Sequence, residues 1–198
     1  LLKLVETSEE IRMQLLELLK IIISCAEEQF KYQFVNSLVA ILKAFAIDPS
    51  PDIQRQANLL ISQFARENKE LLFHFTEQLG RSTLLALVSR NSKVRMAGIE
   101  ALNEVLNCGI WKYNSTIFEI LVGFRDPNSV PIKAFYEYTT HLNYFALLIK
   151  DPKIAVRELF IRSIGDWVTR LPDRYDHHPR LIPYLLAGIF DDYPEIVE

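Results

Sequence analysis

Residues 151–157, Asp-Pro-Lys-Ile-Ala-Val-Arg, decide the fold because their pattern returns along the chain about every 41 residues. In this pattern an acid stands five residues before a β-branched residue, and an arginine follows. The β-branched positions are Ile11, Ile53, Val94, Val156 and Ile196, with steps of 42, 41, 62 and 40 residues. A helical sequence with such a period is typical of an α-solenoid, in which each helical pair packs only on its neighbours. The longest step exceeds the period by 21 residues and indicates an insertion.

Each copy of the pattern is expected to open the second helix of a pair. Asp48-Pro49-Ser50-Pro51 reads as a turn followed by a helix start, because Asp can accept hydrogen bonds from free amides and Pro fits the first turn. Apolar residues then recur every three or four positions, which indicates one buried face. We predict helices near residues 8–26, 30–46, 52–66, 69–89 (with a break or kink at Gly80), 92–107, 140–149, 153–170 and 179–190.

These helices predict an all-α solenoid, a right-handed superhelix of antiparallel pairs. We expect residues 1–198 to form a single array. The sequence lacks an initiator Met and stops inside the fifth copy of the pattern, so we interpret it as a fragment of a longer solenoid.

The recurring acid and arginine predict a structural ladder of ion pairs along the stack. At this spacing an acid of one repeat is expected to reach the arginine of the next, and the planar guanidinium can bridge a carboxylate and backbone carbonyls. Gln54 and Val197 replace the arginine and Ser89 replaces the acid, so the ladder should be weaker there. The predicted ladder residues are Asp48, Asp151, Asp191, Arg12, Arg95 and Arg157.

Residues 110–138 interrupt the array and are rich in aromatic side chains. We expect an inserted, ordered loop between repeats, in which residues 117–124 could form a short helix. Such insertions often carry recognition, although a plug over the core is an equal alternative. Candidate partner-binding residues are Trp111, Tyr113, Phe124, Phe135, Tyr136 and Tyr138.

A short basic stretch lies between Glu77 and Glu100 and contains Arg81, Arg90, Lys93 and Arg95. A solvated helix–turn corner explains it, and the alternative is a site for an acidic partner, for which Lys93 is the candidate. The whole chain has a net charge of −3, which lacks the basic bias of a nucleic-acid binder. No apolar run reaches the 18 or so residues of a membrane span.

Cys25 and Cys108 occupy the same position in repeats that are two apart. Stacked helices are about 8–10 Å apart, so these thiols should be too distant for a disulfide. Two unpaired thiols fit a reducing compartment such as the cytoplasm.

The sequence offers little for catalysis. Asp173, Asp176, His177 and His178 cluster in a predicted turn between helices, where capping is a better explanation than zinc binding because adjacent histidines diverge. The chain has no P-loop, no Gly-x-Ser-x-Gly and no glycine-rich dinucleotide turn. We therefore expect no cofactor, no metal and no enzymatic activity.

The period and the acid-x4-Val-Arg pattern resemble HEAT repeats over nearly the whole chain. Three stretches in this order make the resemblance more specific: 92–101 (SKVRMAGIEA), 165–175 with its Gly-Asp-Trp and Leu-Pro-Asp-Arg-Tyr, and 180–196 from Arg-Leu-Ile-Pro to Asp-Asp-Tyr-Pro-Glu-Ile. Together they resemble the dynein axonemal assembly factor 5 family.

This resemblance implies a non-enzymatic cytoplasmic scaffold that helps dynein arms to assemble before delivery to cilia or flagella. Its partners would be dynein chains, chaperones and other assembly factors. A HEAT scaffold of another system, such as phosphatase regulation or nuclear transport, is the alternative.

Overall fold

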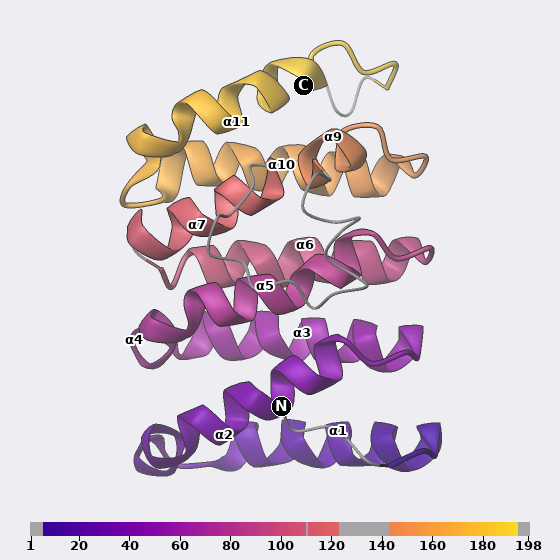
Figure 1. The fold of residues 1–198 in the computed structure, drawn as a ribbon, viewed down its shortest axis with the longest axis vertical. Helices are drawn as coiled ribbons and strands as arrows, with labels where there is room; N and C mark the ends of the chain where they lie inside the picture. Colours follow the sequence, from indigo (N-terminus) through magenta and orange to yellow (C-terminus); the bar gives the residue numbers. More distant parts are fainter. Residues whose placement is uncertain (1–5, 110, 123–142, 194–198) are drawn as a thin grey trace. The chain divides into compact units, whose positions relative to one another are not determined.

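The computed structural model describes residues 6–109, 111–122 and 143–193, with the backbone alone at residues 111–113. The described regular structure consists of helices (Figure 1). The chain divides into two compact units, Leu1–Gly109 and Ile110–Glu198.

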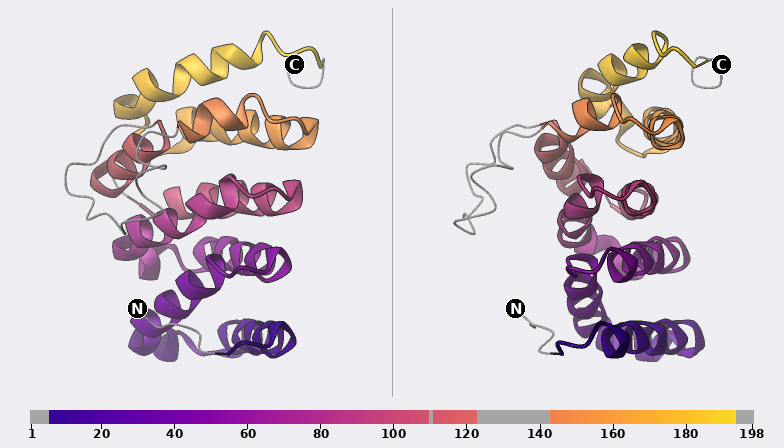
Figure 2. Two further views of the ribbon diagram at one scale, coloured as in Figure 1. Left: turned by 45° about the vertical axis from the view of Figure 1, so that its right-hand side comes forward. Right: turned by 90° about the vertical axis from the view of Figure 1, so that its right-hand side faces the viewer.

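Unit 1 is built of two layers of stacked helices. The second helices of three consecutive pairs form one layer, and the first helices of two of these pairs form the other (Figure 2). The second helices are α1 (Glu9–Cys25), α3 (Pro51–Glu67) and α6 (Ser92–Leu106); the first helices are α2 (Glu28–Ala46) and the segment α4 (Lys69–Leu72), η1 (Phe73–Phe75) and α5 (Thr76–Leu87). Helix α3 packs against both α1 and α6, as a solenoid requires.

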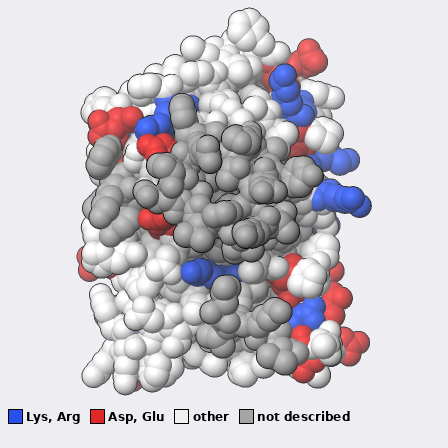
Figure 3. All heavy atoms as spheres, in the orientation of Figure 1, with Lys and Arg blue, Asp and Glu red and all other residues white. Residues whose placement is uncertain are grey.

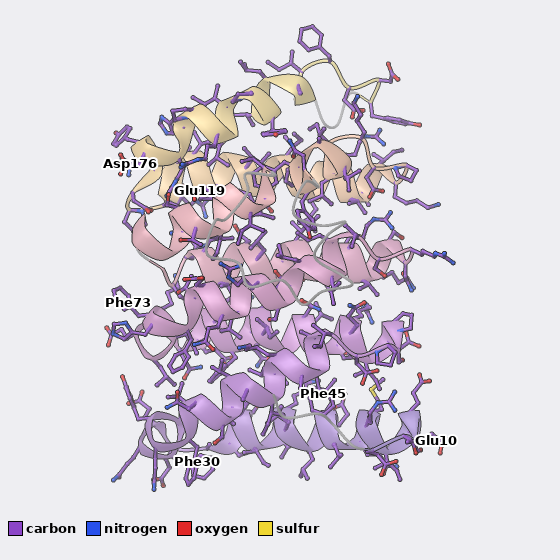
Figure 4. The ribbon with its side chains drawn as sticks, viewed as in Figure 1. Glu10, Phe30, Phe45, Phe73, Glu119 and Asp176 are labelled. Carbon is purple, nitrogen blue, oxygen red and sulfur yellow. The ribbon has the colours of Figure 1, made fainter. Side chains whose placement is uncertain are left out.

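The core of unit 1 lies between the layers, where the buried apolar residues of the helices meet. Phe45 of α2 and Phe64 of α3 are fully buried there, and Figure 4 labels Phe45 on its helix. Burial of such aromatic side chains stabilises a fold by roughly 1.5–3 kcal/mol each. The stripe predicted from the three- and four-residue spacing is therefore the face that holds the layers together.

Unit 2 contains α7 (Trp111–Leu121), α9 (Tyr144–Leu148), α10 (Ile154–Arg170) and α11 (Arg174–Gly188). Aromatic side chains of α7 and α9 pack on the same tryptophan of α10. The ring centroids of Phe118 and Trp167 are 5.6 Å apart, and those of Phe145 and Trp167 are 5.9 Å apart. The two short helices thus cover α10 jointly.

The burial pattern indicates that α7 and α9 are two parts of one first helix. The acid position of each repeat, occupied by Asp48, Ser89 and Asp151, gives a common reference for the first helices. The third and sixth residues before it are buried in α2 (Phe45, Leu42), in α5 (Ala86, Thr83) and in α9 (Leu148, Phe145). The ninth and thirteenth are buried in α2 (Val39, Val35) and around α5 (Gly80, Thr76). If the 21 extra residues are left out of the count, Leu121 of α7 is the ninth residue before Asp151 and Ile117 is the thirteenth. Both side chains are buried.

The segment expected as a loop at residues 110–138 is therefore helical over Trp111–Leu121, earlier than the short helix expected at 117–124. The remainder of that segment lies outside the described residues. Helix α7 ends inside the first helix of its pair, so its apolar stripe is too short to indicate a helix over these residues from the sequence alone.

Two further boundaries differ from the prediction. The helix expected at 69–89 is interrupted at Phe73–Phe75 and not at Gly80. At this interruption the buried Thr76 hydroxyl donates to the carbonyls of Leu72 and Phe73. Such bonds compete with helical ones. Helix α11 begins at Arg174, five residues before Pro179, the residue at which the sequence predicts its start. Pro179 and Pro183 lie inside the helix, although proline interrupts its hydrogen bonding.

The prediction of an all-α solenoid of HEAT-type pairs is confirmed. That residues 1–198 form a single array stays a prediction.

Two helical glycines are expected to respond oppositely to alanine. A Cβ on Gly98 would lie 2.8 Å from the Cβ of Ala86, whereas one on Gly165 would meet nothing within 4 Å. Gly98→Ala should destabilise unit 1 by about 1–3 kcal/mol through overpacking of α5 on α6. Gly165→Ala should stabilise unit 2 by about 0.5–1 kcal/mol through loss of backbone freedom in the unfolded state. Denaturant midpoints check both, and equal shifts of the same sign would contradict the packing.

Candidate functional site

The acid position of the repeat has a local role that all five copies share. Its side-chain oxygen accepts a hydrogen bond from the backbone amide two residues later, which closes the turn before the second helix. The five bonds join Glu6 to Ser8 (2.7 Å), Asp48 to Ser50 (2.8 Å), Ser89 to Asn91 (3.3 Å), Asp151 to Lys153 (2.9 Å) and Asp191 to Tyr193 (3.1 Å). Ser89 therefore keeps the turn function of the acid it replaces.

The arginine of the repeat fixes the same turn from inside its helix. Arg12 Nη1 donates to the carbonyl oxygen of Thr7 (2.9 Å), and Arg95 Nη1 donates to that of Ser89 (2.7 Å). Arg157 Nη1 donates to the carbonyl oxygen of Asp151 (2.6 Å). Each guanidinium thus satisfies carbonyls five or six residues upstream, a task that lysine could not perform with the same planar geometry.

Two arginines also reach forward to the acid of the following repeat. Arg12 binds Asp48 through Nε (2.8 Å) and Nη2 (3.2 Å), and Arg157 binds Asp191 through Nε (2.7 Å) and Nη2 (3.0 Å). The predicted direction was wrong, because the acid belongs to the repeat after the arginine, not before it. The reason is geometric: the acid lies in the turn three residues before its own helix and so faces the preceding second helix.

The corrected direction places two departures from the repeat pattern, at Gln54 and Ser89, in a single arginine–acid pair of the ladder. Gln54 occupies the arginine position of the second repeat, and Ser89 occupies the acid position of the third. With arginine reaching forward, these two residues belong to the same rung of the ladder. Both charges are absent from it, so neither a carboxylate nor a guanidinium is left without its counterpart. Val197, the other departure, lies outside the described residues.

The Arg157–Asp191 contact sets the electrostatics of its rung. The hydrogen bond from Arg157 holds the pKa of Asp191 below its usual value and raises the pKa of Arg157. The guanidinium carbon also lies 5.2 Å from the ring centroid of Tyr193. The carboxylate is therefore ionised and bound throughout the physiological range.

Arg157→Ala is expected to destabilise unit 2 by about 1–3 kcal/mol at neutral pH. A carboxyl whose folded pKa is lowered stabilises the fold above its unfolded pKa, near 3.9. That contribution is lost as the pH falls through the folded pKa. The difference in melting temperature between wild type and Arg157→Ala should therefore be constant from pH 7 to 5 and shrink below about pH 4. A difference that grows on acidification would contradict the ion pair.

The structure leaves most of the predicted partner-binding residues without description. Trp111 and Tyr113 lie in α7, where only the backbone is described, and Phe124, Phe135, Tyr136 and Tyr138 lie outside the described residues. Lys93 is exposed in the first turn of α6, and its amide donates to the Asn91 side chain. The partner-binding assignment stays a prediction.

The basic stretch is smaller than its sequence suggests. Arg81 forms an ion pair with Glu77 at 3.0 Å, and Arg95 is buried with its Nη1 on the carbonyls of Ser89 and Arg90. Arg90 and Lys93 are the exposed cations of the stretch. Figure 3 shows acidic and basic side chains interspersed near the edges of the viewed face. Because Arg81 and Arg95 are already engaged, the stretch fits the solvated-corner interpretation better than a concentrated anion site.

The Asp173–His178 cluster opens α11 and does not form the predicted inter-helix turn. Asp173 is the residue before the helix, and its Oδ2 lies 2.8 Å from Nε2 of the fully buried His177. His178 Nε2 lies 3.1 Å from the carbonyl oxygen of Val168. The ring of Phe118 packs on His177 with centroids 4.6 Å apart. These contacts attach the start of α11 to α7 and α10, and the described residues contain no group of three metal-ligating side chains.

Sequence reasoning missed the polar contacts that hold the split first helix to α11. Glu119 of α7 binds Arg180 at 3.1 Å, and Asn143 donates to the hydroxyl of Tyr184 at 2.6 Å. Figure 4 labels Glu119 on α7, next to the start of α11. Asn143 also accepts from the amide of Ala146, which makes it the N-cap of α9. An Asn directly before an apolar run was the signal that could have revealed that helix start.

Two of the depressions that the described residues form lie on unit 1. One, of about 350 Å³, is surrounded by side chains of both charges; it is lined by Glu28, Lys31, Tyr32, Arg66, Glu67, Asn68, Lys69, Glu70 and Leu71. The other, of about 130 Å³, lies between α1 and α3 and is lined by Leu16, Glu17, Lys20, Gln56, Leu59, Leu60 and Gln63. The linings of both depressions combine carboxylates, amides and cations.

The two thiols should differ in reactivity. Cys25 is exposed, whereas Cys108 is buried and its Sγ donates to the carbonyls of Glu104 (3.2 Å) and Ala65 (3.3 Å). Burial raises the pKa of Cys108 to about 12. Because the thiolate is the reactive species, Ellman's reagent at pH 8 should titrate one thiol of the folded protein rapidly and the second only after unfolding. Cys25→Ser should abolish the rapid phase, and a rapid phase that survives would contradict the burial of Cys108.

None of the described helices combines the length and the apolar character that crossing a membrane requires.

Comparisons with known proteins agree with this architecture. The sequence model of the family described as "Dynein axonemal assembly factor 5-like, TPR repeats" matches residues 2–122 and 132–198. The unmatched residues between these ranges follow α7 directly. The description names TPR repeats, although the 41-residue period seen here is nearer the HEAT range than the 34 residues of a TPR unit.

Three curated relatives are called dynein axonemal assembly factor 5. The one from Xenopus laevis is 28% identical over 98% of this chain, and those from Mus musculus and Homo sapiens are 26% and 24% identical over 96% of it. The match spans only 20%, 20% and 19% of these proteins, so this chain corresponds to about a fifth of their length.

Proposed function

This chain belongs to the dynein axonemal assembly factor 5-like family, and on that basis we propose that it serves as part of a non-enzymatic scaffold for the assembly of axonemal dynein arms. The observation that carries the proposal is the family match over both units, together with relatives named for that process. The proposed partners are dynein chains, chaperones and other assembly factors, and the proposed compartment is the cytoplasm.

The mechanism we propose is recognition by surface area instead of by a deep site. The second helices stack into a layer, with Arg–Asp pairs at the Arg12–Asp48 and Arg157–Asp191 rungs, and the outward residues of α3 and α6 include polar side chains. The outward residues of α3 and α6 include Gln63, Arg66 and Glu104, of which Arg66 and Glu104 form an ion pair at 3.3 Å between consecutive second helices. Such a surface offers many weak contacts to a partly folded client along its length.

The inserted residues and Lys93 are the proposed client contacts. The register of α7 and α9 allows a direct test of the inserted residues. Deleting residues 122–142 removes 21 residues, the length by which the longest step exceeds the period, and joins the two helices in phase. The deletion variant and wild type, each in the full-length protein, should be compared in co-purification with axonemal dynein chains from extracts of ciliated cells. We expect the deletion to reduce capture several-fold.

Two comparisons separate binding from folding. Lys93→Glu should reduce capture, whereas Lys153→Glu, at an exposed lysine before α10, should not. Each variant is first checked for a wild-type melting temperature. Unchanged capture by the deletion variant and by Lys93→Glu would remove these residues from the client surface. A wild-type protein that recovers no dynein chain would overturn the proposed function itself.

A further inference from the structure

The interface between α1 and α3 is closed by side-chain hydrogen bonds at the end nearest the turn acid. Arg12 binds both carboxylate oxygens of Asp48 there. The hydroxyl of Ser50, in the same turn, donates to Oε1 of Glu9 at 2.7 Å. Because Arg12, Asp48 and Ser50 are buried, these bonds are shielded from water. This end of the α1–α3 interface is therefore firmly joined.

The interface between α3 and α6 is joined at its other end. Nη2 of Arg66 lies 3.3 Å from Oε1 of Glu104, and Sγ of Cys108 donates to the carbonyl oxygen of Ala65 at 3.3 Å. The backbone also passes from one helical pair to the next at this end, through Asn68 between α3 and α4, which is at the left of Figure 1. Side-chain bonds and the chain connection thus hold the same end of α3 and α6.

The end of α3 and α6 nearest the turn acid lacks such bonds. Gln54 and Ser89 occupy the rung here, and within the described residues neither side chain bonds across the interface. In the layer of first helices, Lys43 donates to Gln78 at 3.0 Å, but this bond is exposed, so water competes for both groups. Closure of this end therefore depends on packing.

That packing includes a buried amide. Asn58 of α3 is fully buried at the position of Leu16, which lines the depression between α1 and α3, so Asn58 faces α6. Its Nδ2 donates to the carbonyl oxygen of Gln54 in its own helix, and its Oδ1 has no hydrogen-bond partner among the described residues. The other described second helices have Leu16, Ile99 and Ile161 at this position. An oxygen that loses water on burial without gaining a donor destabilises the closed interface.

The helices on the far side of this interface are tightly packed on each other. A Cβ on Gly98 of α6 would lie 2.8 Å from the Cβ of Ala86 of α5. Backbones that approach so closely leave no room for one helix to shift against the other. Helices α5 and α6 therefore behave as one rigid body relative to α3.

We propose that the α3–α6 interface is a hinge within unit 1. The pair α5–α6 opens away from α3 at the end of Gln54 and Ser89, and it pivots about the end held by Arg66, Glu104 and Cys108. The opening is a local event of the folded protein and does not require unit 1 to unfold. It changes the curvature of the layer of second helices, so that its outward surface follows partners of different shape. The hinge is a property of unit 1 and holds whether or not the chain handles dynein.

Thiol labelling tests the hinge at two sites of one molecule. Ala97 of α6 is buried at the position of Gln56, which lines the depression on α1, so Ala97 faces α3 at the opening end. A chain with Cys25→Ser and Ala97→Cys has one thiol at this end and Cys108 at the pivot. The folded chain is incubated with iodoacetamide, and peptide mass spectrometry follows each thiol separately. Each rate is divided by the rate of the same thiol in denaturant.

We expect the thiol at position 97 to be labelled about tenfold faster than Cys108 on this scale. Adding the rung with Gln54→Arg and Ser89→Asp should slow labelling at position 97 several-fold and leave Cys108 unchanged. Equal rates for the two thiols would show that α3 and α6 separate only when unit 1 unfolds, and would overturn the proposal. A new rung that slows both thiols equally, or slows neither, would overturn it as well.

A second probe covers the case in which Ala97→Cys lowers the melting temperature. Asn58→Cys places the thiol on the facing helix at the same end of the interface. We expect it, too, to be labelled faster than Cys108, and labelling no faster than that of Cys108 would contradict the hinge.

Discussion

Asp48→Ala is expected to lower the melting temperature of unit 1 more than the double substitution Arg12→Gln with Asp48→Ser does, although the latter changes two residues. The alanine removes the carboxylate that binds Arg12 at 2.8 Å and the acceptor of the Ser50 amide. It leaves a guanidinium held in the structure by its other bonds to the carbonyls of Glu6 and Thr7. Removing one partner of a buried pair costs more than replacing both, because the remaining charge is uncompensated.

The double variant copies a rung that the protein already contains. Gln54 and Ser89 occupy these two positions one repeat later, and Ser89 still accepts the amide of Asn91. Thermal melting of wild type, Arg12→Gln, Asp48→Ser, Asp48→Ala and the double variant measures the coupling directly. The expected order of stability is wild type, then the double variant, then Asp48→Ala. If the double variant lost more stability than the two single variants lose together, Arg12 and Asp48 would not form one rung.

The reverse exchange is the matched control. Gln54→Arg alone should destabilise, because an arginine would face a serine, whereas Gln54→Arg with Ser89→Asp should recover the loss. The pairing of these two positions follows from the forward direction of the ladder. If Ser89→Asp did not recover the stability lost in Gln54→Arg, the forward direction would be wrong at this rung.

The sequence could predict the elements whose signals are local. The period, the apolar stripes and the turn acids lie within one helix or one turn, and for that reason the helices from α1 to α3 and α6 were placed within two residues of their observed bounds. The direction of the ladder could not be predicted, because a carboxylate in the turn before a helix is equally compatible in sequence with an arginine of the preceding or the following repeat. Only the packing of α1 on α3 distinguishes the two.

The remaining misses share a cause, which is that a local signal was overridden by tertiary contacts. Pro179 looked like a helix start, yet His177 is buried beneath Phe118 and bonded to Asp173, which extends α11 upstream. Threonine at position 76 is not a strong helix-breaking residue. Its buried hydroxyl nevertheless donates a hydrogen bond to a helix carbonyl and interrupts the helix before α5. Contacts of this kind form between residues that the pattern alone does not bring together.

Deletion of residues 122–142 is expected to leave a folded unit 2, whereas deletion of residues 122–141 should destabilise it severely. Removing 21 residues joins Leu121 to Asn143 and places Phe145 and Leu148 at the same distance from Leu121 as their counterparts in α2 lie from Val39. The Asn143 cap is no longer needed, since its helix would be continuous with α7. Retaining one more residue rotates α9 by about 100° about the helix axis and moves it by about 1.5 Å.

That rotation would withdraw Phe145 from its contacts with Trp167 and Phe160, whose ring centroids lie 5.9 and 5.2 Å away. Loss of a buried phenylalanine from its site costs about 3–5 kcal/mol, comparable to the whole stability of a small unit. Circular dichroism and thermal melting distinguish the two variants, which differ by a single residue. A 20-residue deletion as stable as the 21-residue one would show that α7 and α9 are not two parts of one helix. Because the two deletions remove nearly the same residues, composition cannot account for a difference between them, and only helical phase can.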